Sequence, residues 1–151
     1  MKLAMIGLGR MGGSMVRRLM RGGHECVVFD RNPETVRELA GEGAIGATSL
    51  ADVIAKLEAP RIVWIMLPAG EVTSAAVSEL ATLLSRGDIV IDGGNSFWKD
   101  DLVRARTLGE KGITYLDVGV SGGVWGLGRG YCLMVGGPGE IAAQLDPIFA
   151  T

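Results

Sequence analysis

The sequence has 151 residues, enough for one domain with a sizeable hydrophobic core. Hydrophobic residues make up 48% of the chain and charged residues 21%, which is typical of a soluble globular protein. The formal net charge of −2, without a basic stripe, argues against a nucleic-acid partner, and no apolar run approaches the roughly 20 residues of a membrane span.

The start of the chain and its cysteines predict a cytoplasmic protein. Met1 and Lys2 lead directly into a strand-like run, so no signal peptide is expected. Cys26 and Cys132 lie far apart in apolar runs and form no metal or redox motif, so we expect buried, reduced thiols.

The first predicted strand, 3–6, leads into a glycine-rich turn and a helix predicted from Ser14 to Met20. The glycines have the spacing G-x-G-x-x-G. The first permits a tight turn, the second lets backbone approach a pyrophosphate, and the third lets the helix pack closely on the strand. The strand–turn–helix context favours a dinucleotide site over an ordinary glycine-rich turn. The cofactor contacts predicted here are Gly7, Leu8, Gly9, Arg10, Met11 and Gly12.

The second predicted strand, 25–29, ends at an acidic residue. The Asp30 carboxylate can accept hydrogen bonds from the adenosine ribose hydroxyls and would repel a ribose 2′-phosphate, which favours NAD. The neighbouring Arg31 could instead pair with that phosphate, so NADP stays possible. An alternative role for Asp30 is to cap the helix predicted from Pro33.

The rest of the chain alternates between predicted helices and strands. Helices are expected at 33–40, 49–59, 71–84 and 97–111, with a last one after 136–139. Strands are expected at 44–47, 61–67, 88–92, 114–118 and 131–135. This alternation predicts a Rossmann-like, doubly wound α/β fold, with a mostly parallel sheet and helices on both faces.

Loops follow three of these strands on the same predicted edge of the sheet, at 68–70, 93–96 and 121–123. Ligands bind at that carboxyl edge in open α/β sheets. Asn95 offers a donor and an acceptor for an amide or sugar hydroxyl. The serine and glycines at 121–123 offer a hydroxyl and N–H groups for a carboxylate or phosphate. Alternatively, these stretches only cap the next helix or bend the chain.

Other polar and aromatic residues are predicted to lie outside the chemistry. His24, the only histidine, falls in a turn at the amino end of the second strand, so we expect a surface residue. No Ser-His-Asp set and no metal-ligand cluster can be built from this sequence. We expect Asp100 and Asp101 to be solvated helix charges, and Trp125 either to wall a pocket or to pack in the core.

Taken together, four stretches resemble the 6-phosphogluconate dehydrogenase family. They are 7–12, 91–96, 119–123 and 133–137, and the match covers essentially the whole chain as that family's N-terminal coenzyme-binding domain. The Asp-Gly-Gly-Asn-Ser sequence within the second is the specific part, because the first and third are shared with the wider β-hydroxyacid dehydrogenases. Many members that use NADP have Asn-Arg-Thr after the second strand. This chain has Asp-Arg-Asn there, which resembles the short bacterial, NAD-preferring type, as does Val-Trp-Gly in place of Glu-Glu-Gly after residue 123.

The resemblance implies an oxidoreductase that oxidatively decarboxylates 6-phosphogluconate to ribulose 5-phosphate and carbon dioxide with NAD(P), in the pentose phosphate pathway. Asn95 would lie between nicotinamide and substrate. The other substrate contacts would be Ser121, Gly122 and Gly123. Further cofactor contacts would come from Leu67, Pro68 and Ala69.

The same resemblance implies that this domain is half of an active site. The family's general base, general acid and helical dimerisation domain would lie beyond residue 151, so we expect the fragment to be inactive and the full-length protein to be a homo-oligomer. Residues 148–151 carry no charge or turn signal, which also predicts a domain cut from a longer protein. The alternatives are a β-hydroxyacid dehydrogenase of the 3-hydroxyisobutyrate type and a non-catalytic nucleotide-binding module.

Overall fold

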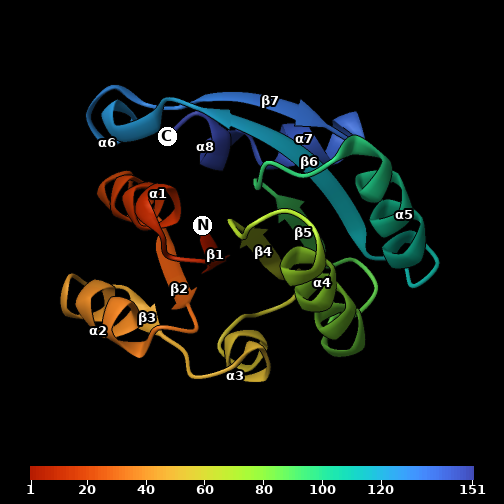
Figure 1. The fold of residues 1–151 in the computed structure, drawn as a ribbon, viewed down its shortest axis with the longest axis horizontal. Helices are drawn as coiled ribbons and strands as arrows, with labels where there is room; N and C mark the ends of the chain where they lie inside the picture. Colours follow the sequence, from red (N-terminus) through yellow and green to blue (C-terminus); the bar gives the residue numbers. More distant parts are fainter.

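A single seven-stranded sheet lies at the centre of the protein, with strand order β3-β2-β1-β4-β5-β6-β7 (Figure 1). The computed structural model describes residues 1–151, apart from the side chain of Val124. The strands are β1 (Lys2–Ile6), β2 (Glu25–Phe29), β3 (Ile45–Gly46), β4 (Ile62–Ile65), β5 (Ile89–Asp92), β6 (Thr114–Ser121) and β7 (Cys132–Gly136). Strands β1 to β6 pair in parallel, and β7 pairs antiparallel with β6.

Helices cover both faces of this sheet, which confirms the predicted doubly wound α/β class. They are α1 (Arg10–Arg21), α2 (Pro33–Gly41), α3 (Leu50–Ala55), α4 (Glu71–Leu83), α5 (Trp98–Gly109), α6 (Gly126–Arg129), α7 (Gly139–Gln144) and α8 (Asp146–Phe149). A short 3-10 helix, η1 (Gly123–Trp125), precedes α6. Helix α3 is shorter than the predicted 49–59, because the chain turns at Lys56 before Pro60.

Two hydrophobic cores follow from the alternation of side chains along each strand. Leu3 and Met5 of β1 belong to the core under α1, α2 and α8, whereas Ala4 and Ile6 belong to the core under α3, α4 and α5. Both faces of the central strands are therefore buried, as a continuous apolar run predicts for a parallel sheet. This leaves the carboxyl edge of the sheet as the place where loops from several strands meet (Figure 1).

The C-terminal third of the fold differs from the prediction. The strand expected at 114–118 continues to Ser121, and Gly119, Val120 and Ser121 pair with Met134, Leu133 and Cys132. A parallel return requires a crossover of about a dozen residues or more, usually through a helix. Residues 122–131 form only η1 and α6, so β7 returns antiparallel and lies at the edge of the sheet.

His24 is buried rather than a surface residue. Its Nδ1 lies 3.2 Å from the Met1 amine, and its Nε2 lies 3.1 Å from the Pro147 carbonyl oxygen and 3.0 Å from the Thr151 hydroxyl. These partners indicate that Nε2 carries the proton and Nδ1 accepts. Burial and the nearby N-terminal charge lower the pKa of His24. The prediction was wrong because α8 folds back to the amino edge and covers the ring.

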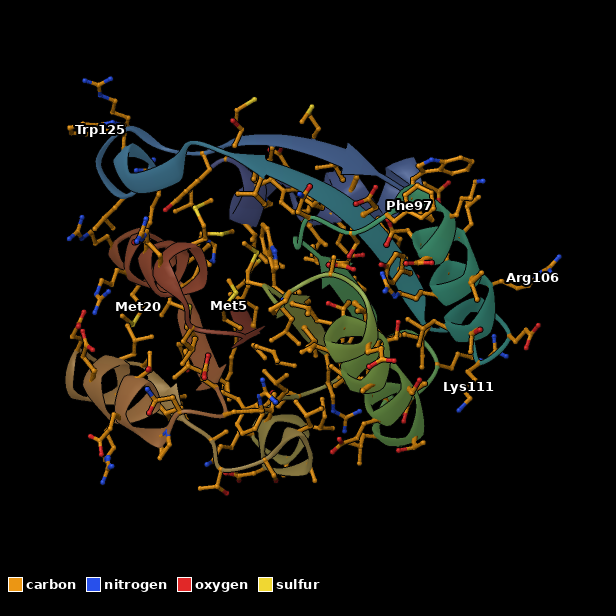
Figure 2. The ribbon with its side chains drawn as sticks, viewed as in Figure 1. Met5, Met20, Phe97, Arg106, Lys111 and Trp125 are labelled. Atoms are coloured by element: carbon orange, nitrogen blue, oxygen red, sulfur yellow. The ribbon has the colours of Figure 1, made fainter. Side chains whose placement is uncertain are left out.

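Two further side chains differ from expectation. Cys26 is buried as predicted, and its burial raises the pKa of that thiol to about 12. Cys132, on the edge strand β7, is exposed, contrary to the prediction. Trp125 is 68% exposed and projects away from the sheet (Figure 2), so it neither walls the cleft nor packs in the core. The Arg129 guanidinium lies 5.4 Å from its ring centroid.

Among the helices that the structure describes, none is long and apolar enough to span a bilayer.

Candidate dinucleotide-binding cleft

The glycines of the β1–α1 turn have different surroundings. Gly7 has a φ of 91°, and its N–H donates to the Phe29 carbonyl oxygen over 2.9 Å. A Cβ on Gly7 would overlap the Met66 carbonyl, and a Cβ on Gly12 would overlap the Gly7 carbonyl. Gly9 instead has no atom within 4 Å of the place where its Cβ would lie. The first and third glycines are therefore required by packing, and the second faces open space.

The amino end of α1 is suited to an anion. Gly9 is the N-cap residue, with no side-chain cap, and the first turn contains no acidic residue. Backbone N–H groups at the start of a helix lack internal partners and carry the positive end of the helix dipole. Open space at Gly9 and these free donors fit a pyrophosphate group.

A cleft of about 680 Å³ lies in front of this turn, at the carboxyl edge of the sheet. The residues that line it are Gly7, Gly9, Arg10, Met11, Gly12, Asp30, Arg31, Met66, Leu67, Pro68, Val72, Gly93, Gly94, Asn95, Gly119, Val120 and Met134. It therefore brings together the ends of β1, β2, β4 and β5 and the outer part of β6.

Most of the predicted cofactor contacts and Asn95 line this cleft. Among the described residues, the predicted site residues outside its lining are Leu8, Ala69, Ser121, Gly122 and Gly123. Sequence reasoning missed several lining residues: Met66, Val72, Gly93, Gly94, Gly119, Val120 and Met134. The glycines, Val120 and Met134 belong to the stretches that carry the family resemblance, and Met66 belongs to the predicted strand at 61–67, whereas Val72 carries no signal in the sequence.

A second cavity of about 530 Å³ continues the cleft along the same edge. It shares five lining residues with the cleft: Gly7, Asp30, Arg31, Leu67 and Val72. Its remaining walls come from the turn before α3 and from α4, through residues that include Ser49 and Ala76. An elongated ligand can therefore lie across the glycine-rich turn with one end in each cavity.

Asp30 connects the glycine-rich turn to the end of β2. Its Oδ2 accepts the Leu8 N–H over 2.7 Å, and its Oδ1 accepts the Asn32 N–H over 2.8 Å. The helix cap is Asn32, whose Oδ1 accepts the Glu34 N–H, so the capping role considered for Asp30 is wrong. Each carboxylate oxygen keeps a second lone pair, which can accept a ribose hydroxyl.

The Asp-Gly-Gly-Asn-Ser loop follows β5 and presents Asn95 to the cleft. A Cβ on Gly93 would overlap the Trp64 indole, and one on Gly94 would lie 2.7 Å from the Leu67 carbonyl oxygen. The exposed Asn95 side chain lines the cleft. Helix α5 starts after Phe97 without a side-chain cap, so the alternative role of this loop as a helix cap does not hold for the described residues.

The turn at 121–123 lies at the end of β6, one residue beyond the cleft lining. Gly122 has a φ of 146° and Gly123 a φ of 51°. The Tyr131 ring packs against this turn, since a Cβ on Gly122 would lie 3.0 Å from its Cδ1. The substrate contacts expected at Ser121, Gly122 and Gly123 remain predictions. The direction in which this turn presents its hydroxyl and N–H groups depends on its packing against the Tyr131 ring.

The cleft is equipped for binding more than for proton transfer. Among its described lining residues, the ionisable ones are Arg10, Asp30 and Arg31, and none lies on the Asn95 loop. No group of described histidines, cysteines and acids could hold a metal ion. The arrangement can bind and orient a dinucleotide and a small polar molecule beside Asn95.

The chain matches a family model described as the NAD binding domain of 6-phosphogluconate dehydrogenase over residues 2–151. It is 42% identical over 149 residues to the NAD(+)-dependent, decarboxylating 6-phosphogluconate dehydrogenase of Haloferax volcanii. That alignment covers 99% of this chain and 49% of the relative. The chain thus spans about half the length of this curated relative.

Solved structures of dehydrogenases share this fold. A Plasmodium falciparum 6-phosphogluconate dehydrogenase, described as apo, with its cofactor NADP+ and with its substrate 6-phosphogluconate, aligns with a TM-score of 0.89 at 28% identity. The alignment covers 99% of this chain and 33% of that one. A Mycobacterium tuberculosis 3-hydroxyisobutyrate dehydrogenase aligns with a TM-score of 0.88 at 27% identity, over 98% of this chain and 50% of that one.

Proposed function

Because the chain belongs to the family of NAD-binding domains of 6-phosphogluconate dehydrogenase, we propose that it is the coenzyme-binding half of an enzyme that oxidatively decarboxylates 6-phosphogluconate. The products are ribulose 5-phosphate and carbon dioxide, with NAD(P) as oxidant. The single observation that carries this proposal is the position of Asn95. The family-specific loop brings its amide into the same cleft as the glycine-rich turn.

Different residues of the cleft bind different parts of the coenzyme and substrate. Backbone N–H groups at Gly9 and the start of α1 hold the pyrophosphate, and Asp30 accepts from the adenosine ribose. When bound, NAD(P) supplies a nicotinamide ring that accepts hydride. Asn95 orients the nicotinamide or a substrate hydroxyl through its amide donor and acceptor. Pro68 and Leu67 line the wall between these ends.

We favour NAD as the coenzyme. The Asp30 carboxylate would repel a 2′-phosphate, and its position is fixed by the Leu8 and Asn32 N–H groups. The Haloferax volcanii relative is described as NAD(+)-dependent, which supports the same choice. Arg31 lines both cavities, so weaker NADP binding is expected.

We also propose the cellular compartment, the assembly and the partners of the protein. A cytoplasmic enzyme without a nucleic-acid partner fits the net charge of −2 and the buried Cys26 thiol. The proposed homo-oligomer rests on the family's helical dimerisation domain. General acid and base groups would come from outside residues 1–151, since the Haloferax volcanii relative is about twice as long. We therefore expect the 151-residue chain to bind coenzyme without turnover.

The second candidate is a dehydrogenase for 3-hydroxyisobutyrate or a similar β-hydroxyacid. The TM-score of 0.88 with the Mycobacterium tuberculosis enzyme favours it. The Asp-Gly-Gly-Asn-Ser loop at 92–96 argues for 6-phosphogluconate instead.

The test measures NADH formation by a longer protein that contains this domain. We expect turnover with 6-phosphogluconate and little with 3-hydroxyisobutyrate, and the opposite preference would support the second candidate. NAD binding without turnover of either substrate would indicate a non-catalytic nucleotide-binding module. The isolated chain serves as the control, and steady-state NADH formation by it would contradict the proposed division of the active site.

A further inference from the structure

A buried polar cluster lies directly beneath the loop that carries Asn95. Its members are Asp92, Asp101, Arg104 and Tyr115, with exposed fractions of 0%, 6%, 5% and 6%. They come from β5, α5 and β6. Asp101 is thus part of the interior and not a solvated helix charge, contrary to the prediction. A buried charge is costly unless it is paired and hydrogen-bonded, so the partners of these groups define what the cluster does.

Asp92 holds the loop on both sides of Asn95. Its Oδ1 accepts the Gly94 N–H over 2.9 Å, and its Oδ2 accepts the Ser96 hydroxyl over 2.9 Å. Since Gly94 and Ser96 flank Asn95 in the chain, one carboxylate holds the backbone before Asn95 and the side chain after it.

The other contacts of Asp92 anchor that carboxylate to the fold. Its Oδ2 lies 2.9 Å from the Tyr115 hydroxyl and 3.3 Å from Arg104 Nη1. Asp101 Oδ1 lies 2.8 Å from the same hydroxyl and 3.0 Å from the same nitrogen. Arg104 Nη2 donates to the Ser74 hydroxyl of α4 over 3.0 Å. The loop is therefore tied through Asp92 to α4, α5 and β6.

The charges of the cluster favour an acceptor at position 92. Burial opposes the charged form of Arg104, but its contacts with Tyr115, Asp92 and Asp101 raise its pKa above the ordinary value. Burial and the charges of Asp101 and Asp92 raise the pKa of nearby Asp117. The Gly94 N–H and Arg104 Nη1 can only donate, and they face different oxygens of Asp92. An amide at this position would therefore place its N–H₂ group against one of these donors.

We propose that Asp92 is a positioning residue for Asn95, holding the loop so that the Asn95 amide faces the nicotinamide end of the cleft. This proposal rests on the proposed function, because it requires NAD to lie in the cleft. Asp92 is covered by the loop and acts through Gly94 and Ser96.

The test compares two ligands on the 151-residue chain. ADP carries the adenosine and pyrophosphate, and NAD adds the nicotinamide riboside that would reach Asn95. Asp92→Asn and wild type are titrated with each ligand by calorimetry, and the Asn95 side-chain amide is followed by NMR. We expect ADP affinity to change by less than about twofold and NAD affinity to fall about fivefold, as for one misplaced hydrogen bond. The NAD-specific shift of the Asn95 amide signal is also lost.

Asp88→Asn is the matched control. Asp88 is likewise 0% exposed, and it accepts the Arg61 N–H over 2.7 Å and the Ser85 N–H over 2.9 Å. It lies before β5, at the opposite end of the strand from Asp92. Its substitution removes comparable buried contacts, so we expect lower stability with the NAD-to-ADP affinity ratio and the Asn95 shift unchanged.

Ser96→Ala keeps the proposal testable if Asp92→Asn does not fold. It removes one of the two loop contacts of Asp92 and leaves the buried carboxylate paired with Tyr115 and Arg104. We expect the same selective loss for NAD, about twofold. An unchanged NAD-to-ADP ratio and Asn95 shift in the variants that fold would overturn the positioning role. Wild type that binds neither ligand would instead overturn the proposed function.

Discussion

At the scale of single residues, the glycine pattern separates into packing and ligand positions. Gly7 and Gly12 have carbonyl groups where a Cβ would lie, and Gly9 has nothing within 4 Å. All three roles could be predicted from the spacing, because the strand–turn–helix geometry is shared by dinucleotide sites. The additional contact between Asp30 and the Leu8 N–H could not, since it depends on how closely β2 approaches the turn.

The glycine roles predict different outcomes for two alanine variants. Gly12→Ala should lower the free energy of unfolding by at least about 2 kcal/mol, because its Cβ overlaps the Gly7 carbonyl. Gly9→Ala should cost no more than about 1 kcal/mol, from the preference of an N-cap position for glycine over alanine, while weakening NAD binding, because its methyl group enters the pyrophosphate space. Urea denaturation and calorimetric titration measure the two effects. Equal destabilisation by both variants would contradict this assignment.

The Asp30 carboxylate is expected to decide between coenzymes. Asp30→Ala removes the ribose acceptor and the repulsion of a 2′-phosphate, so NAD affinity should fall about tenfold or more and NADP affinity should fall less. The Leu8 N–H loses its partner in either case, so part of the loss is common to both coenzymes. Parallel titrations give the ratio, and equal losses would count against the ribose contact.

At the scale of elements, the order of the main strands and helices was predictable as far as β7, but the extension of β6 to Ser121 and its antiparallel pairing with β7 were not. Apolar runs such as Ile62–Ile65 are typical of strands buried on both faces. In contrast, Gly119 and Ser121 belong to β6 only because β7 pairs beside them. Their own side chains carry no strand signal, and the pairing depends on how η1 and α6 turn the chain.

The α6 turn offers a matched pair of variants. A Cβ on Gly126 would overlap the Tyr131 ring, whereas one on Gly128 meets no atom within 4 Å. Gly126→Ala should therefore destabilise the protein by about 1–3 kcal/mol, and Gly128→Ala should be neutral or stabilising by up to about 1 kcal/mol. Thermal unfolding of both variants checks this. A neutral Gly126→Ala would show that Tyr131 does not support the turn.

At the scale of the whole molecule, His24 joins the two ends of the chain at the amino edge. It contacts the Met1 amine, the Pro147 carbonyl and the Thr151 hydroxyl. These contacts could not be predicted, because α8 is distant in sequence and its return to this edge depends on the packing of Leu145 and Ile148 in the core. The fold class needed only the order of elements, so it could be predicted.

The lowered pKa of His24 gives the stability a defined pH dependence. The unfolded chain binds a proton near the ordinary histidine pKa of about 6.5, and the folded chain binds it only at lower pH. Stability should therefore fall as pH drops below about 6.5 toward the folded pKa, and be retained above it. Denaturation of wild type and His24→Gln between about pH 8 and pH 5 measures the difference. An identical slope in both proteins would rule out this linkage.

The carboxyl-edge cleft is proposed to bind a dinucleotide with its nicotinamide beside Asn95. Backbone amide NMR of the 151-residue chain during an NAD titration tests it most directly. We expect saturable shifts at 7–12, at Asp30 and at 93–95, with the amino edge around His24 unchanged. The absence of saturable shifts, or shifts confined to other surfaces, would contradict the account.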